Sequence, residues 1–217
     1  MAKIISFATQ KGGSGKSTLA ILTSTAIANR YGKKILLIDA DPQQTVMDIY
    51  MRHKDRTKYD VEFFNWNTKS KNDYRNLLMG AGNKYHYIIV DVPGKMGGEE
   101  VFNSVMMSDV VCVPVVPRRT DIASTAKFLK VLPKIAEARK KQGFSFDVFG
   151  IPNKMDNTIE STFIKKLDGV GGLALFNNGL SYRIRYDREL STSDTIVMVN
   201  KEDEFNDYMK EIEMRIL

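Results

Sequence analysis

The sequence predicts an α/β fold: a doubly wound, mostly parallel sheet with helices on both faces. Apolar runs without alternation of polar and apolar residues recur along the 217-residue chain, namely IISF (4–7), ILLID (35–39), YIIVD (87–91), VVCVPVV (110–116) and FDVFGI (146–151). Such runs are typical of strands that are buried on both faces of a parallel sheet. Segments of helical character lie between the runs, and a glycine-rich loop follows the first one. Strands that alternate with helices favour the doubly wound architecture.

Two segments between the runs predict helices. STLAILTSTAIANRYG (17–32) ends on Gly32, a residue suited to the C-terminus of a helix. IASTAKFLKVLPKIAEARKKQG (122–143) contains Pro133, which lacks a backbone N–H and predicts a kink or break.

The stretch 52–75 has the weakest pattern, and we expect only a strand at Val61–Phe64 within it. The sequence shows no repeat, low-complexity tract or linker. The length suits one domain, so we expect residues 1–217 to form a single P-loop domain.

The composition indicates a globular protein that buries a core. Hydrophobic residues make up 43% and charged residues 27% of the chain. The single cysteine, Cys112, lies in an apolar run, where we expect a small core residue; one cysteine excludes a disulfide framework or a cysteine-built cluster within one chain. No signal peptide and no apolar run of membrane-spanning length is visible, so a cytoplasmic location is expected.

Charge is spread unevenly over the chain. The net charge is +6, yet residues 199–217 contain six acidic and three basic residues. The basic excess therefore lies in the remainder. A basic body suits a polyanionic partner such as a nucleic acid, although charge alone leaves this partner open.

The stretch ATQKGGSGKST (8–18) predicts a phosphate-binding loop between a strand and a helix. Its glycines lack a Cβ, so the backbone can curl and point successive N–H groups at phosphate oxygens. Lys16 is placed to bind the β- and γ-phosphates, and the Ser17 hydroxyl to ligate Mg²⁺. The predicted nucleotide-binding residues of the loop are Gly12, Gly13, Ser14, Gly15, Lys16, Ser17 and Thr18.

Three aspartates lie at the ends of the second and third apolar runs or just after them. Asp39 and Asp41 stand in ILLIDADPQQT, and Asp91 stands in YIIVDVPG. In open parallel sheets, ligands bind at the carboxyl ends of the strands. Carboxylates placed there can hold Mg²⁺ or orient an attacking water.

The motifs KGGSGKS (11–17), DADPQ (39–43) and DVPG (91–94) together resemble the ParA/MinD family of deviant Walker ATPases. The likeness extends well from Lys3 to about Asp121 and more weakly to about Thr195. QKGGSGKS followed by DADPQ is similar to the DNA-partition branch in particular, which does not require a glycine at Gln10. Val92 and Arg118–Arg119 depart from the usual pattern, and the two arginines suggest a locally specialised surface.

The resemblance implies roles for these residues. Lys11 would reach across a dimer interface to the partner's nucleotide, so that Lys11, Lys16 and Asp41 form the catalytic set, with Asp41 positioning the hydrolytic water. Ser17, Asp39 and Asp91 would act through Mg²⁺. ATP would join two copies into a sandwich dimer. No arginine finger is evident, so unaided hydrolysis should be slow and open to stimulation by a partner.

The resemblance also implies a cellular role. An ATP-bound dimer would bind DNA without sequence preference and become associated with the nucleoid. A ParB-like centromere-binding adaptor would stimulate its release. The cargo would be a plasmid or other mobile element.

Asn153-Lys154-Met155-Asp156 spells the guanine-binding pattern N-K-x-D. In the partition ATPases an asparagine at this strand end contacts adenine instead, often beside a basic residue, so Asn153 and Lys154 are predicted to contact the base. ATP is favoured, and a SIMIBI-type GTPase remains an alternative.

Basic residues in the C-terminal part are candidates for binding DNA phosphates. Arg183 and Arg185 would share one face of a strand. The full set is Lys165, Lys166, Arg183, Arg185 and Arg188.

A positioning ATPase like MinD, acting on a non-DNA cargo, is the other alternative. Its basic terminal helix lies on anionic lipid, whereas EDEFNDYMKEIEMRIL (202–217) is amphipathic but acidic. We expect this segment to pack on the sheet rather than on a membrane.

Overall fold

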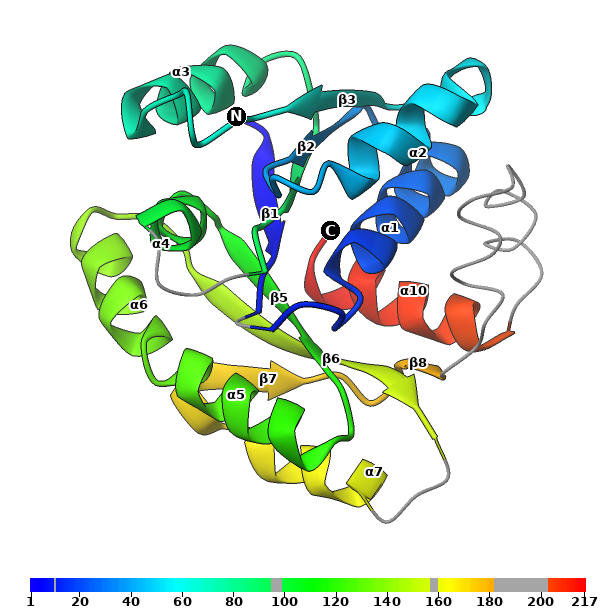
Figure 1. Ribbon diagram of the computed structural model, residues 1–217, viewed down its shortest axis with the longest axis vertical. Helices are drawn as coiled ribbons and strands as arrows, with labels where there is room; N and C mark the ends of the chain where they lie inside the picture. The colour runs from blue at the N-terminus through cyan, green and yellow to red at the C-terminus, as the bar shows by residue number, and fades with distance from the viewer. Residues whose placement is uncertain (10, 95–98, 157–159, 182–202) are drawn as a thin grey trace.

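A computed structural model describes residues 1–9, 11–94, 99–156, 160–181 and 203–217. Its centre is a parallel sheet in the order β3-β2-β4-β1-β5-β6-β7, with β8 paired to β6 (Figure 1). The strands are β1 Lys3–Phe7, β2 Ile35–Asp39, β3 Asp60–Phe63, β4 Tyr87–Asp91, β5 Val110–Val115, β6 Asp147–Met155, β7 Leu173–Leu175 and β8 Leu180–Ser181. The predicted α/β class is confirmed.

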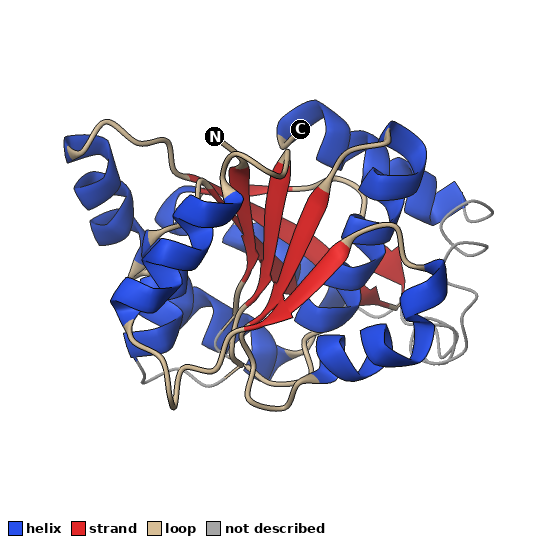
Figure 2. Cartoon of the chain, turned by 90° about the horizontal axis from the view of Figure 1, so that it is seen from above, coloured by secondary structure: helices blue, strands red, loops and turns tan. Residues whose placement is uncertain are grey.

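Helices cover both faces of this sheet (Figure 2). The α-helices are α1 Lys16–Tyr31, α2 Thr45–His53, α3 Lys71–Ala81, α4 Glu99–Met106, α5 Arg119–Leu129, α6 Leu132–Lys141, α7 Glu160–Phe163 and α10 Asp203–Arg215. Short 3-10 helices are η1 Lys54–Arg56, η2 Ile164–Leu167 and η3 Val170–Gly172.

Two apolar clusters hold the layers together, one on each face. Alternate residues of a strand enter opposite clusters: Ile35 and Leu37 pack with α1 and α10, whereas Leu36 and Ile38 pack with the layer of α3 to α6. This is why the strand sequences are apolar throughout. Cys112 is buried in the first cluster, as a core residue.

The predicted helix boundaries have clear local causes. Gly32 has the left-handed φ of 59° that ends α1. The predicted helical segment 122–143 divides into α5 and α6, because Pro133 has no N–H to donate to the preceding turn. The strand expected at Val61–Phe64 is β3, one residue earlier.

The acidic C-terminal segment packs on the sheet as α10, as expected. Phe205, Tyr208, Met209, Ile212 and Ile216 are buried in the cluster shared with α1. Tyr208 also forms a hydrogen bond of 2.7 Å with Thr23 of α1. Across the described residues, no helix combines the length and apolar composition that a membrane crossing needs.

The strand order places a ligand site at one edge of the sheet. β1 lies between β4 and β5, so the chain leaves β1 and β4 toward opposite sides. In such sheets the carboxyl ends of these strands form a crevice at the point where the order reverses. The loop after β1 and the aspartates that end β2 and β4 meet there.

Candidate functional site

The loop between β1 and α1 has the curled backbone that its glycines permit. Gly13 and Gly15 have φ angles of 75° and 92°, which side chains other than glycine rarely adopt. Gly15 precedes α1, and its carbonyl accepts the Leu19 N–H at 2.9 Å. The N–H groups of the first turn of α1 therefore border the loop, where they favour an anion. Gln10 lies outside the described residues.

Lys16 and Ser17 open α1 beneath this loop. Lys16 is only 6% exposed, and its Nζ lies 3.0 Å from where a Cβ on Gly94 would stand. A side chain at position 94 would therefore crowd the lysine. Ser17 Oγ donates a 2.5 Å hydrogen bond to Asp91 Oδ2 at the end of β4. Ser17 of the loop and Asp91 at a strand end, two of the predicted site residues, therefore lie next to each other in the structure.

Asp39 and Asp91 are register partners at the carboxyl ends of β2 and β4. Both are fully buried. Burial raises the pKa of Asp39 to about 6, against backbone hydrogen bonds that lower it. Burial also raises the pKa of Asp91 to about 7, while Ser17 and Lys16 act in the opposite direction. The two carboxylates thus form a compact acidic pair that a cation would stabilise.

The donor set around Asp91 fits a magnesium ion. Asp91 Oδ1 is buried without a hydrogen-bond partner among the described residues, so it has lone pairs available beside the Ser17 hydroxyl. Mg²⁺ is usually bound by one or two carboxylates together with waters and substrate phosphates. No group of three or more His, Cys, Asp or Glu residues in the described ranges forms a metal cage. Ser17 and Asp91 would supply protein oxygens to such an ion.

Asp41 is tied to the turn that follows β4. Asp41 Oδ2 accepts the Gly94 N–H at 3.1 Å, and its Oδ1 accepts the Gln43 N–H at 3.0 Å. Since Gly94 also approaches the buried Lys16, the Gly94 backbone lies between Asp41 and this lysine. The DVPG turn and the DADPQ turn are thereby joined at the mouth of the loop.

Lys11 contacts its own chain in this structure. Its Nζ pairs with Asp121 Oδ1 and lies 3.2 Å from Thr120 Oγ1, both at the start of α5. The Lys11 side chain is 42% exposed and that of Asp121 is 12% exposed. Asp121 was not among the predicted site residues. The available signal was its position a few residues after the fourth apolar run, where it stands in the first turn of α5.

Asn153 is also brought to the loop. Its Nδ2 donates to the Ser14 carbonyl at 2.8 Å and lies 2.3 Å from where a Cβ on Gly15 would stand, so a side chain at position 15, already disfavoured by the φ of 92°, would displace Asn153. Lys154 is half-buried with a positive φ of 55°. The Asp156 carboxylate of the N-K-x-D pattern accepts the Ser161 hydroxyl at 2.9 Å.

The predicted DNA-binding residues are only partly visible. Lys165 and Lys166 are exposed on η2. Arg183, Arg185 and Arg188 lie outside the described residues.

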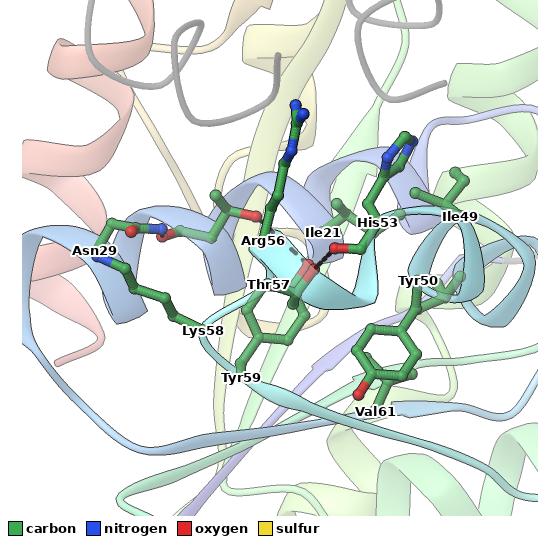
Figure 3. A pocket seen from close by; sticks show the side chains of 12 residues that line it. Ile21, Asn29, Ile49, Tyr50, His53, Arg56, Thr57, Lys58, Tyr59 and Val61 are labelled. Atoms are coloured by element: carbon green, nitrogen blue, oxygen red, sulfur yellow. Dashed lines mark hydrogen bonds between the residues drawn. The ribbon is translucent and has the colours of Figure 1, made fainter. Parts of the chain in front are cut away.

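A separate hollow lies between α1, α2 and β3 (Figure 3). Its volume is about 40 Å³, enough for a few waters and too small for a nucleotide. Residues that line it also hydrogen-bond to one another: Thr57 Oγ1 donates to the His53 carbonyl at 3.0 Å. The nucleotide-type site is therefore the loop and the strand ends, not this hollow.

Comparisons with known proteins agree with this geometry. The model of the CobQ/CobB/MinD/ParA nucleotide binding domain matches residues 5–196. The chromosome partitioning protein ParA of Caulobacter vibrioides is 45% identical over 62 residues, which cover 27% of this chain and 23% of that protein. An uncharacterized protein of Pseudomonas putida is 27% identical over 150 residues, which cover 52% of this chain and 56% of the relative. The matches therefore span less than two thirds of either relative.

Solved structures share the fold. An ATP complex of a McdA variant from Cyanothece has a TM-score of 0.76 at 17% identity, over 98% of this chain and 95% of that one. A putative plasmid partition protein from Borrelia burgdorferi bound to AMPPNP has a TM-score of 0.69 at 20% identity, over 98% of this chain and 100% of that one. The MinD cell division protein of Aquifex aeolicus has a TM-score of 0.71 at 19% identity, over 100% of this chain and 99% of that one.

Proposed function

Because the chain belongs to the CobQ/CobB/MinD/ParA nucleotide-binding family, we propose that it is an Mg²⁺-dependent ATPase of the partition type. ATP joins two copies into a sandwich dimer, and the dimer binds DNA without sequence preference. A ParB-like centromere-binding adaptor stimulates slow hydrolysis, which returns the protein to monomers. The cargo is plasmid or other mobile-element DNA, carried over the nucleoid in the cytoplasm.

The observation that carries the proposal is the arrangement of Ser17, Asp91 and Lys16 around one loop. Ser17 donates to one oxygen of Asp91, and the other oxygen is buried without a partner in the described residues. Lys16 is buried beside the Gly94 backbone at the mouth of the same loop. A phosphate chain on the loop with Mg²⁺ at Ser17 and Asp91 satisfies all three groups.

Each group has a task in this proposal. Lys16 and the loop N–H groups bind the β- and γ-phosphates, and Asp39 adds a second carboxylate beside Asp91, where a cation would relieve the repulsion between the two. Mg²⁺, when bound, neutralises charge on the phosphate oxygens. Asp41 orients the attacking water, from a position already fixed by its hydrogen bonds to Gly94 and Gln43. Asn153 braces the loop and, with Lys154, borders the base.

Lys11 has a different task from Lys16. It is half-exposed and held at the entrance of the loop by Asp121, rather than buried over the phosphates. We assign it to the nucleotide of the partner subunit, so that ATP itself contributes to the dimer interface. Reaching the partner requires Lys11 to leave Asp121.

The test is binding to a random-sequence duplex with no nucleotide, ADP, ATP or GTP, each at low and moderate salt. The proposal expects binding that requires ATP and weakens steeply with salt, because phosphate contacts release counterions. Binding driven by GTP would instead support the GTPase alternative through Asn153–Asp156. Absence of binding under every condition would contradict the DNA-binding part of the proposal.

A further inference from the structure

Exposed basic side chains gather on one part of the surface, formed by α5, α6 and η2. α5 contacts both α6 and η2, and the helices α5 and α6 lie next to each other at one edge of the molecule (Figure 1). The exposed basic residues are Arg118, Arg119, Lys127, Lys130, Lys134, Lys140, Lys141, Lys165 and Lys166. Segments 118–141 and 164–167 are described throughout, and Glu137 is their one exposed acidic residue. We call these nine residues the α5–α6 surface.

Packing of the two helices turns this surface toward solvent. Phe128 and Leu129 of α5 and Leu132 and Ile135 of α6 are buried in the cluster on that face of the sheet. The lysines between them therefore point outward. Of the large apolar residues on these helices and the turn that joins them, Val131 is exposed, at 38%. In the described helices α5 and α6 the large apolar residues are therefore mainly on the buried side, and the exposed side is mainly basic.

Local structure explains only part of this charge. Lys140 and Lys141 stand in the last turn of α6, where a cation is favoured, and Lys141 pairs with Glu137 at 2.7 Å. Lys134 stands in the first turn of α6, which contains no acidic residue, so the helix dipole disfavours it. Lys127 and Lys130 are three residues apart, a spacing at which like charges repel. Within the described residues, Lys127, Lys130 and Lys134 have no hydrogen bond or ion pair.

A second basic segment offers a comparison. Residues 52–58 expose four basic side chains, but Asp48, Asp55 and Asp60 are exposed within or beside this segment. The α5–α6 surface is larger: its nine exposed basic residues face two exposed acids, Glu137 within it and Asp168 directly after η2. Charge complementarity to a polyanion is therefore stronger on α5 and α6.

We propose that the α5–α6 surface binds the phosphate backbone of double-stranded DNA. This inference rests on the DNA-binding part of the proposed function and gives it a location among the described residues. Lysines on long flexible stems, without a fixed array of amide or hydroxyl groups, suit phosphate contacts rather than base recognition. Lys127, Lys130 and Lys134 are its centre, and Lys165 and Lys166 extend it.

The test variant is Lys127→Glu/Lys130→Glu/Lys134→Glu, with Lys127→Gln/Lys130→Gln/Lys134→Gln as a milder form. The matched control, Lys33→Glu/Lys54→Glu/Lys71→Glu, changes the net charge equally at exposed positions on other elements. Affinity for a random duplex is measured with ATP and Mg²⁺ over a salt series. Thermal unfolding and ATP-driven dimerisation establish that each variant is folded and competent.

Glutamate variants on the surface should weaken DNA binding by about tenfold or more at low salt, and glutamine variants by less. The slope of log affinity against log salt should become shallower by about 2 to 3, one phosphate for each lysine. The matched control should retain most of the affinity, since charge elsewhere acts only at long range.

The failures can be told apart. If the wild-type protein fails to bind DNA under every condition (without nucleotide or with ADP, ATP or GTP) while it still dimerises on ATP, the DNA-binding part of the proposed function is wrong and this inference falls with it. If the wild-type protein binds but the surface variant binds equally well, or the control loses as much, the surface is wrong while the function stands. The assignment of DNA binding to the α5–α6 surface would also be overturned if only Arg183→Glu/Arg185→Glu lost DNA affinity. Binding of anionic vesicles in place of DNA would overturn it as well.

Discussion

The ammonium group of Lys11 pairs with the carboxylate of Asp121, a residue 110 positions away at the start of α5 of the same chain. Thr120 Oγ1 lies 3.2 Å from the same nitrogen. The two lysines of the loop are therefore separated in space: Lys16 is buried over the loop and Lys11 is held to the side. In our proposal, this separation divides them between the chain's own phosphates and those of its partner.

Asp121→Asn should favour the ATP-driven dimer, because Lys11 no longer leaves an ion pair when two subunits meet. A partly exposed pair contributes about 0.2–1 kcal/mol. Two such pairs shift the dimer dissociation constant downward by roughly 2- to 30-fold. Sedimentation over a range of protein concentrations with ATP measures this constant. Asp147→Asn, at an exposed position on β6, is the control; a dimer unchanged or weakened by Asp121→Asn would refute the competition.

Lys16→Ala should weaken nucleotide binding strongly. The buried ammonium forms charge-assisted bonds to phosphate, worth about 1.5–3 kcal/mol, so ATP affinity should fall roughly 10- to 150-fold. Titration calorimetry with ATP and Mg²⁺ measures the change, with Lys33→Ala beyond the other end of α1 as the control. ATP-driven dimerisation that survives in Lys16→Ala would show that the loop is wrongly assigned.

Asp41→Ala should separate binding from hydrolysis. Loss of the group that orients the water should lower the ATP turnover rate by roughly 10²- to 10⁴-fold, while the ATP-bound dimer persists. Phosphate release and molar mass are measured on the same sample. Asp48→Ala, an exposed carboxylate on α2, should leave both unchanged. Normal turnover in Asp41→Ala would remove this residue from the mechanism.

Asp91→Asn should stabilise the protein when nucleotide and metal are removed. Burial raises the pKa of Asp91 to about 7, whereas an aspartate in the unfolded chain ionises near pH 4. Above pH 4 the ionised carboxylate therefore lowers the free energy of unfolding, and this destabilisation is complete above pH 7. The variant should gain about 1–4 kcal/mol of unfolding free energy at pH 8, and the gain should shrink as the pH falls toward 5. Urea unfolding with a chelator present measures this. A gain independent of pH would contradict the role of ionisation.

The same variant should lose the stabilisation that Mg²⁺ and ATP give to the wild-type protein, since the carboxylate proposed to hold the ion is absent. Ser24→Ala is a useful comparison, because the buried Ser24 hydroxyl also lacks a partner in the described residues but lies in the middle of α1.

Sequence patterns predicted the central strands and the loop because these depend on local composition. A strand buried on both faces must be apolar throughout, and a loop around phosphate needs glycines at Gly13 and Gly15. The helix α3 was not predicted, although Ser70 and Asp73 form the capping box that opens it. The short strands β7 and β8 were not predicted either, since two or three residues carry no measurable periodicity.

The tertiary contacts of the site were beyond sequence patterns. The pairs Lys11–Asp121 and Asn153–Ser14 join residues more than a hundred positions apart, and neither leaves a pattern within its own segment. The Gly94–Asp41 bond likewise links two separate turns. Their proximity follows only from the strand order that brings β2, β4, β1, β5 and β6 to one edge.

The central claim is that ATP, through Lys11, forms part of a dimer interface. The most direct test is the molar mass of the protein in solution by light scattering, with ATP and Mg²⁺ or with ADP, for the wild type, Lys11→Ala and the hydrolysis-deficient Asp41→Ala. We predict a dimer for the wild type and Asp41→Ala with ATP only, and a monomer that still binds ATP for Lys11→Ala. A Lys11→Ala protein that dimerises on ATP as well as the wild type would contradict the account.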